Sequence, residues 1–307
     1  MKAAYFIKHG GPEVMLYGDV ADPVAAPGEV LVDVHAASVN GADWKVRAGS
    51  YAPVTAFPYV PGRDFSGIVS ALGDGVNEFA TGDAVFGVCD VGREQAYAGK
   101  VVIAASIVTR KPDSLSHEEC AALALTGLTA LVSIEDTLQL KSGETILIQG
   151  GAGGVASFAI QLAKHLGARV ITTASAANHD YLRKLGADQI IDYNTQDFTE
   201  LASGCDAVFD TVGGAVATRS FTCLRPGGRA AFIASGNAAP VSPRADVTSL
   251  RPKVGRSRAH LDRIVSLVTS GAVRVPEITL YSLADAAAAH RMSEGRHFRG
   301  KLVFKVR

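Results

Sequence analysis

The sequence predicts an α/β protein of two domains, in which a β-rich domain precedes a doubly wound parallel sheet. Its 307 residues are enough for two domains. Short strand-like runs without intervening helices fill the first part, to about residue 117. From Glu144 onward, strand-like and helix-like segments alternate, which is the pattern of βαβ units in a parallel sheet.

The first part holds five predicted strands, at Lys2–Ile7, Glu29–Val39, Phe65–Ala71, Ala84–Val88 and Gln95–Ile103. Turn-forming residues separate them, rich in glycine and proline. Consecutive strands of this kind favour a barrel or a sandwich.

The pattern changes near Lys111-Pro112-Asp113. Ser116 followed by Glu119 has the spacing of a capping box, so we expect a helix to begin there. An alanine- and leucine-rich helical stretch follows, to about Leu138.

The second part holds predicted strands at Thr145–Gln149, Arg169–Thr173, Gln189–Ile191, Ala207–Phe209 and Arg229–Ile233. Predicted helices lie at Val155–Leu166, Ala177–Leu185, Ala215–Leu224 and about Ser257–Thr269. The chain ends in two more strand-like runs, Thr279–Ser282 and Lys301–Lys305. The last run has no obvious partner in the second part, so we expect it to return to the first domain.

Between the first of these strands and its helix lies a glycine cluster. Gly151, Gly153 and Ala156 fill the places of G-x-G-x-x-G/A. These places serve a tight turn, the close approach of a pyrophosphate, and close helix–strand packing. The helix that begins at Gly154 and Val155 would offer free N–H groups to phosphates. The pattern predicts a dinucleotide site; the alternative is a plain tight turn.

Charge and cysteine content exclude several classes of protein. Lys+Arg and Asp+Glu are equal at 30 each, which gives no drive toward nucleic acid or anionic membranes. Residues Met1–Gly10 lack the apolar core of a signal peptide, and we find no run of bilayer-spanning length. The four cysteines are scattered without a C-x-x-C, so we expect neither a disulfide framework nor a cysteine zinc cluster. A cytoplasmic protein is the simplest expectation.

Five further motifs occur in order along the chain: Val39–Gly49, Pro61–Gly67, Leu125–Ala130, Leu185–Asp188 and Gly300–Val303. With the glycine cluster they resemble the zinc-independent quinone oxidoreductase branch of the medium-chain dehydrogenase/reductase superfamily. That branch includes NADPH:quinone reductases, ζ-crystallin and enone reductases. The resemblance covers essentially the whole chain.

The resemblance implies a GroES-like β-barrel domain built from residues 1–117 and 273–307. It implies a Rossmann domain over 118–272, hydride transfer from NADPH in the cleft between the domains, and a homodimer. Asn40 and Arg63 stand where related alcohol dehydrogenases carry zinc ligands. An amide and a guanidinium cannot replace a thiolate and an imidazole, so no metal is expected. Without a Lewis acid, an electrophilic quinone or enone is the favoured acceptor.

The end of the second Rossmann strand decides the cofactor. Residues 172–175 contain no Asp or Glu to hold a ribose 2′-hydroxyl, which argues against NAD. Relatives often carry a lysine where this chain has Asn178. Ser175 and Asn178 can donate to a 2′-phosphate, with Arg183 or His179 as a source of positive charge. NADPH is therefore expected.

Two residues are candidates for catalysis. Asn40 could donate a hydrogen bond to the acceptor oxygen, or it could only bridge the backbone at a strand end. Tyr51 resembles the family's cleft tyrosine and could donate a proton, or it could be an aromatic lid. Asp43 and Arg47 lie four apart and are expected to pair on a helical turn. Arg63 and Asp64 are expected to form an ion pair.

The remaining candidates concern the cofactor. Thr126, at the start of a predicted helical turn, could bind phosphate or nicotinamide, or act as a cap or back-bond. Tyr193 could stack on adenine or simply pack on the surface. Val212 and Ser235 follow the fourth and fifth strands, where ligands bind. The stretch 244–263 holds Arg251, Lys253, Arg256 and Arg258 and is expected to be a solvated face or a mobile loop. The alternative is a site for an acidic partner or for a long anionic substrate tail.

These observations predict an NADPH-dependent reductase of quinones or enones with no nucleic-acid or membrane partner. The alternative is a non-catalytic NADPH-binding protein of structural or regulatory function. A zinc alcohol dehydrogenase is a weaker third possibility.

Overall fold

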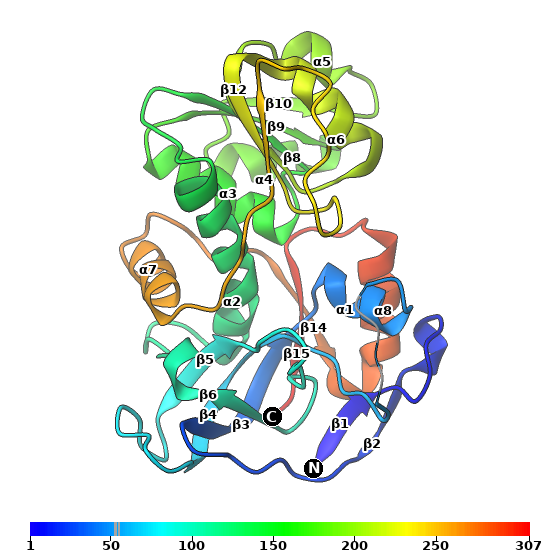
Figure 1. The fold of residues 1–307 in the computed structure, drawn as a ribbon, viewed down its shortest axis with the longest axis vertical. Helices are drawn as coiled ribbons and strands as arrows, with labels where there is room; N and C mark the ends of the chain where they lie inside the picture. Colours follow the sequence, from blue (N-terminus) through cyan, green and yellow to red (C-terminus); the bar gives the residue numbers. More distant parts are fainter. Residues whose placement is uncertain (52–53, 55) are drawn as a thin grey trace. The chain divides into compact units, whose positions relative to one another are not determined.

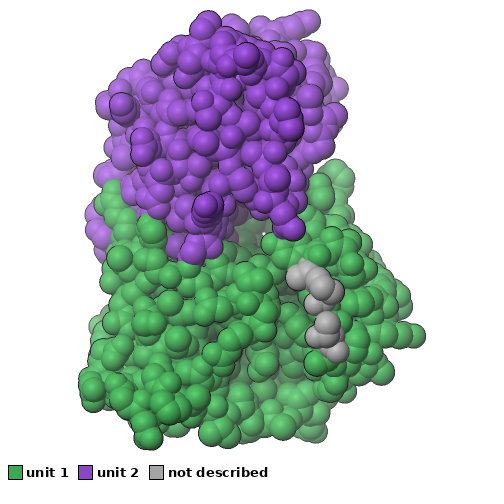
Figure 2. All heavy atoms as spheres, in the orientation of Figure 1, with its two compact units in different colours: residues 1–125, 256–265, 277–307 green, residues 126–255, 266–276 purple. Residues whose placement is uncertain are grey.

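The computed structural model describes residues 1–51, 54 and 56–307 (Figure 1). Its contacts divide the chain into two units, which Figure 2 colours separately. Unit 1 contains Met1–Leu125, Arg256–Val265 and Glu277–Arg307. Unit 2 contains Thr126–Gly255 and Ser266–Pro276.

The main sheet of unit 1 runs in the order β14-β15-β3-β4-β5-β7, with β6 also paired to β3. Its strands are β3 (Glu29–Ser38), β4 (Asp64–Leu72), β5 (Ala84–Val88), β6 (Lys100–Ala104), β7 (Val108–Arg110), β14 (Ile278–Ser282) and β15 (Lys301–Lys305). A small antiparallel sheet pairs β1 (Lys2–Tyr5) with β2 (Leu16–Asp19). β15 lies antiparallel to β3, so the C-terminal strand joins the N-terminal part of the chain, as the sequence predicts.

One local prediction for unit 1 needs correction. The run Gln95–Ile103 is a strand only from Lys100 onward. Ahead of it the backbone N–H of Tyr97 donates to Pro61, and those of Gln95 and Ala96 donate to Gly62. Gly62 has a φ of +98°, and a Cβ there would collide with the Tyr97 ring, so this contact requires glycine.

Four α-helices lie in the described part of unit 1 or begin in it; one of them, α7 (Arg258–Thr269), is described with unit 2. α1 (Gly41–Arg47) extends the helical turn expected around Asp43 and Arg47, and α8 (Ala286–Gly295) begins with a run of four alanines. α2 (His117–Leu131) begins in unit 1. The predicted capping box is present: Ser116 and Glu119 exchange hydrogen bonds at 2.8 and 3.1 Å.

α2 continues into a π-helical turn, Val132–Thr137. The stretch His117–Thr137 is long and apolar enough to cross a membrane by length and composition alone, which the sequence reading did not recognise. Its most apolar window is 72% buried in the protein, as is typical of a core helix.

Unit 2 contains the parallel sheet, in the order β10-β9-β8-β11-β12-β13. Its strands are β8 (Thr145–Gln149), β9 (Arg169–Ala174), β10 (Gln189–Asp192), β11 (Cys205–Asp210), β12 (Leu224–Phe232) and β13 (Thr248–Leu250). Every neighbouring pair is parallel. The sequence predicts this doubly wound architecture, apart from the short edge strand β13.

The helices of unit 2 connect these strands. They are α3 (Gly154–His165), α4 (His179–Lys184), α5 (Phe198–Leu201) and α6 (Gly214–Ser220). α7 (Arg258–Thr269) extends over residues of both units. Apolar side chains such as Leu147, Val208 and Phe232 are fully buried and form part of the core around the sheet. The carboxyl ends of β8, β9 and β11 therefore have a rigid base.

Candidate functional site

The glycine loop joins β8 to α3 in unit 2. Gly150 has a φ of +77°, and the N–H of Gly153 donates to the Gly150 carbonyl at 3.0 Å, which closes a tight turn. Gly153 is the N-cap of α3. The first N–H groups of a helix have no acceptor within it, and the positive end of its dipole attracts anions. Gly154 and Val155 therefore present donors suited to a diphosphate.

The two fingerprint glycines differ in what surrounds them. A Cβ on Gly151 would lie well under 3.0 Å from the Thr172 hydroxyl oxygen and 3.1 Å from a Leu182 methyl. On Gly153 it would meet nothing nearer than the Gly150 carbonyl oxygen, at 3.5 Å. Packing inside the protein thus requires glycine at 151. Gly153 leaves open space at a helix N-terminus, which fits the close approach of a pyrophosphate.

Thr126 lies inside α2, well after the first residue of that helix, His117, so its predicted place at the start of a helical turn is wrong. Its side chain is buried, and its hydroxyl has no hydrogen-bond partner among the described residues. Neither a cap nor a back-bond therefore explains it. A buried hydroxyl without a partner is consistent with the predicted contact to a cofactor.

The carboxyl end of β11 carries a buried carboxylate that sequence reasoning did not single out. Asp210 accepts a hydrogen bond from the Gly213 N–H at 2.7 Å, while its Oδ2 has no partner among the described residues. Burial raises the pKa of Asp210 to about 6. Its position at a strand end, in the loop that also holds Val212, was the available signal. The Val212 side chain is partly exposed, and the Ser235 hydroxyl donates to the Ala238 carbonyl.

The end of β9 brings two predicted residues together. The Asn178 amide donates to the Ser175 hydroxyl oxygen at 3.1 Å. Arg183 is exposed and paired with Asp180 at 2.5 Å. Tyr193, after β10, is 52% exposed, so its ring is accessible to a ligand. The roles of these residues remain predictions.

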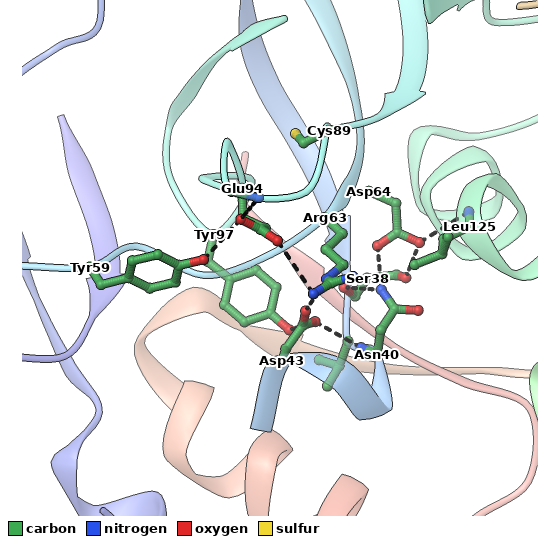
Figure 3. A network of polar contacts seen from close by, with 12 residues as sticks. Ser38, Asn40, Asp43, Tyr59, Arg63, Asp64, Cys89, Glu94, Tyr97 and Leu125 are labelled. Atoms are coloured by element: carbon green, nitrogen blue, oxygen red, sulfur yellow. Dashed lines mark hydrogen bonds and ion pairs between the residues drawn. The ribbon is translucent and has the colours of Figure 1, made fainter. Parts of the chain in front are cut away.

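In unit 1, Asn40 lies at the centre of a polar network (Figure 3). Its amide nitrogen donates to Asp64 at 2.7 Å, and its amide oxygen accepts from Lys301 at 2.8 Å. Its backbone N–H donates to Asp43 at 2.9 Å, which caps α1. Both ends of the amide are therefore held by charged groups. The Nδ2 contact to the Ser38 carbonyl, at 3.4 Å, is the weakest of its bonds.

The expected Arg63–Asp64 ion pair is wrong. Arg63 instead lies 3.3 Å from Glu94 and 3.7 Å from Asp43, and all three side chains are buried (Figure 3). Asp64 accepts from Ser38 and Asn40 and from the Leu125 N–H. Consecutive side chains in extended backbone point to opposite sides, so neighbours in sequence do not meet.

The expected Asp43–Arg47 pair is also wrong. Arg47 is fully buried and binds Glu294 at 3.0 Å and the Gly10 carbonyl at 3.1 Å. Asp43 accepts from the Tyr97 hydroxyl at 2.7 Å. Burial raises the pKa of Asp43 to about 6, although Arg63 and these hydrogen bonds oppose the shift. The α1 helix is held by partners distant in sequence, on α8 and near the N-terminus.

Tyr51 is 41% exposed, and its ring centre lies 5.2 Å from the guanidinium carbon of Arg63. The geometry therefore places an exposed phenol beside the buried network, while its role as a proton donor stays a prediction. Several of the arginines between 244 and 263 donate hydrogen bonds to backbone carbonyls, contacts that the predicted solvated face does not include. Arg251 donates to Phe232, Arg256 to Cys89 and Arg258 to Val108.

The residues at the metal position do not fit a metal ion. Asn40 uses its amide within the protein, and Arg63 is a cation. Over residues 1–51, 54 and 56–307, no group of three or more His, Cys, Asp or Glu side chains could hold a metal. The four cysteines are buried and unbonded to one another. Asn40 and Arg63 therefore do not supply the thiolate and imidazole donors that a zinc mechanism would need.

A parallel sheet with a dinucleotide-binding turn, attached to a GroES-like β unit, defines an oxidoreductase that uses a nicotinamide cofactor. Comparisons with known proteins agree. Residues 26–116 match the alcohol dehydrogenase GroES-like domain, and residues 185–304 match the zinc-binding dehydrogenase family.

The chain is 33% identical to a quinone oxidoreductase of Pseudomonas aeruginosa, over 98% of each protein. It is 31% identical to a 2-haloacrylate reductase of Burkholderia sp, over 98% of each. The solved Escherichia coli quinone oxidoreductase complexed with NADPH matches with a TM-score of 0.91 and 29% identity, over 100% of each chain. This chain belongs to the medium-chain dehydrogenase/reductase superfamily, in the branch of the quinone oxidoreductases and 2-haloacrylate reductases. The family uses NAD(P)H.

Proposed function

We propose that this protein is an NADPH-dependent reductase that transfers a hydride to a quinone or an α,β-unsaturated carbonyl compound. The observation that carries the proposal is Gly153, whose missing side chain leaves open space at the N-terminus of α3. Among the described residues a Cβ on Gly153 would meet only the Gly150 carbonyl oxygen, at an ordinary contact distance of 3.5 Å, whereas a bound diphosphate needs that space.

Each cofactor-binding residue has a distinct task in this proposal. Gly153, Gly154 and Val155 hold the diphosphate through backbone N–H groups. Ser175 and Asn178 bind the adenosine 2′-phosphate. When bound, NADPH supplies the hydride. Thr126, Tyr193, Val212 and Ser235 are proposed to contact the remaining parts of the cofactor.

NADPH is proposed over NADH for a reason of charge. The end of β9, Thr172–Ser175, has no carboxylate that would bind a ribose diol and repel a phosphate. The Escherichia coli relative described above binds NADPH. Both facts support the choice of the phosphorylated cofactor.

The acceptor is proposed from the chemistry of unit 1. Asn40 and Arg63 cannot ligate a metal, so no Lewis acid polarises the acceptor, which must itself be electrophilic. A quinone, or an alkene conjugated to a carbonyl, meets this requirement. Asn40 would donate to the acceptor oxygen, and Tyr51 or water would supply the proton that completes the reduction.

The test is a screen of acceptors with NADPH and NADH in parallel. Benzoquinones, simple enones, 2-chloroacrylate and a saturated ketone are compared by loss of absorbance at the wavelength of the reduced cofactor. We expect turnover of at least one conjugated acceptor, faster with NADPH, and none of the saturated ketone. Tight NADPH binding without turnover of any acceptor would instead support the non-catalytic alternative.

A further inference from the structure

Lys301, the first residue of β15, is a buried cation. Its side chain is only 6% exposed. Its ammonium group donates to the Asn40 amide oxygen at 2.8 Å and to the Val39 carbonyl at 2.8 Å. Burial lowers the pKa of this ammonium group, while the carboxylates of Asp64 and Asp43 oppose the shift.

A buried carboxylate faces the opposite end of the same amide. Asp64, on β4, accepts from the Asn40 amide nitrogen at 2.7 Å. Its second oxygen accepts from the Ser38 hydroxyl at 2.8 Å and from the Leu125 N–H at 3.3 Å. The order is therefore ammonium, amide, carboxylate. A flipped amide would put its NH₂ group against the ammonium and its oxygen against the carboxylate, so only one orientation is stable.

Strand pairing brings these three residues together from distant parts of the chain. Ser38 of β3 is opposite Val303 of β15 on one side and opposite Asp64 of β4 on the other. Asn40 follows β3 by two residues and caps α1. The central strand thus delivers the amide to the point where both charged neighbours meet it.

Burying a cation and an anion costs solvation free energy, and apolar residues of similar size often stabilise a fold as well or better. A purely structural contact between β15 and β3 does not need this arrangement. The charged pair does specify one property that apolar residues cannot, namely which way the Asn40 amide faces. The second Nδ2 hydrogen meets only the weak contact to the Ser38 carbonyl, at 3.4 Å. In the proposed reaction this hydrogen would leave the Ser38 carbonyl and donate to the acceptor oxygen.

We propose that Lys301 is a positioning residue of the reductase, which acts by fixing the Asn40 amide together with Asp64. The proposal rests on the proposed function, because it assigns Lys301 to the side of the reaction that handles the acceptor. It predicts that Lys301 affects the acceptor step only through Asn40. NADPH binding, which we assign to unit 2, should not depend on it.

The experiment is a double-mutant cycle on the full-length protein with the best acceptor of the screen. It compares wild type, Lys301→Met, Asn40→Ala and the double variant, with Lys305→Met as the control because Lys305 is an exposed lysine on the same strand. We expect Lys301→Met to lower kcat/KM for the acceptor about 10- to 100-fold, the usual effect of a misplaced catalytic group. The dissociation constant of NADPH should stay within about twofold, which is less than 1 kcal/mol.

The double variant decides between positioning and an independent effect. If Lys301 acts through Asn40, the double variant is no slower than Asn40→Ala alone. Multiplied losses in the double variant, or a Lys301→Met enzyme as fast as wild type, would overturn the proposal. If Lys301→Met does not fold, Lys301→Met/Asp64→Asn removes both buried charges together, and the same comparison is made with and without Asn40→Ala. An inactive wild type would refute the proposed function itself, so the two failures are distinguishable.

Discussion

Replacing Gly151 or Gly153 with alanine adds the same methyl group to one loop, yet the two variants should fail in different ways. At 151 the new Cβ would overlap the Thr172 hydroxyl and touch Leu182. The Thr172 hydroxyl cannot simply rotate away, because it donates to the Ile148 carbonyl at 2.7 Å. Overpacking costs about 1–3 kcal/mol and a lost buried hydrogen bond about 1 kcal/mol more. We therefore expect Gly151→Ala to destabilise unit 2 by about 2–4 kcal/mol.

At 153 the backbone is already in a conformation that alanine adopts, with a φ of −73°. The entropy gained by replacing glycine and the loss of a favourable N-cap residue are each below about 1 kcal/mol and opposite in sign. Stability should hardly change. The methyl group would instead occupy the space assigned to the diphosphate, so the dissociation constant of NADPH should rise about 10-fold or more, equivalent to at least about 1.4 kcal/mol.

Thermal unfolding without cofactor and fluorescence titration with NADPH separate the two effects. Gly151→Ala should lower Tm by about 5–10 °C, scaled from the few degrees per kcal/mol of proteins this large. Gly153→Ala should keep the wild-type Tm. The reasoning would be refuted by wild-type NADPH affinity in Gly153→Ala, or by equal losses of Tm in both variants.

Three further changes test other parts of the structure. Ser175→Asp places a carboxylate beside the proposed 2′-phosphate. The kcat/KM for NADPH divided by that for NADH should therefore fall by about 10-fold or more. An unchanged ratio would contradict the assigned phosphate site. Arg47→Met breaks the contacts of a buried guanidinium to Glu294 and Gly10 and should cost about 3 kcal/mol in urea unfolding, whereas a cost below about 1 kcal/mol would show that these bonds contribute little. Asp210 has a folded pKa of about 6, above its usual 3.8, so the folded state binds the extra proton and wild-type stability falls as pH rises from about 4 to about 6. Asp210→Asn should remove this loss of stability, which is on the order of 3 kcal/mol for two pKa units. The variant should therefore be more stable than wild type at pH 8 but not at pH 4. Equal dependence of stability on pH in the two proteins would be inconsistent with the buried ionisation.

Local patterns in the sequence predicted the features that depend on neighbouring residues. β8 and β15 have the predicted bounds, and the capping box of Ser116 and Glu119 is present. The glycine loop is also local, because its turn and its helix start lie within a few residues. Such features follow from periodicity, turn chemistry and capping, which operate over one or two turns of chain.

The side-chain network of unit 1 was not predictable in this way. Asn40 meets Lys301 across 261 positions, and Arg47 meets Glu294 across 247. The sequence reading paired Arg63 with Asp64 and Asp43 with Arg47 because they are near in sequence, while strand alternation and the sheet register select other partners. For α1 the sequence predicted only a helical turn around Asp43 and Arg47, because the helix has seven residues and begins with a glycine. Its stability comes from the Asp43 cap and the buried Arg47, which only the tertiary structure shows.

The most direct test of the account follows the hydride itself. NADPH deuterated at both C4 positions is incubated with the protein and a conjugated acceptor found in the screen, and the reduced product is analysed by mass spectrometry and NMR. For an enone, we predict one deuterium per product molecule, bound to the carbon β to the carbonyl, with a matching amount of NADP⁺. Product without deuterium, or NADPH that binds but is never oxidised with any acceptor, would contradict hydride transfer as the function of this protein.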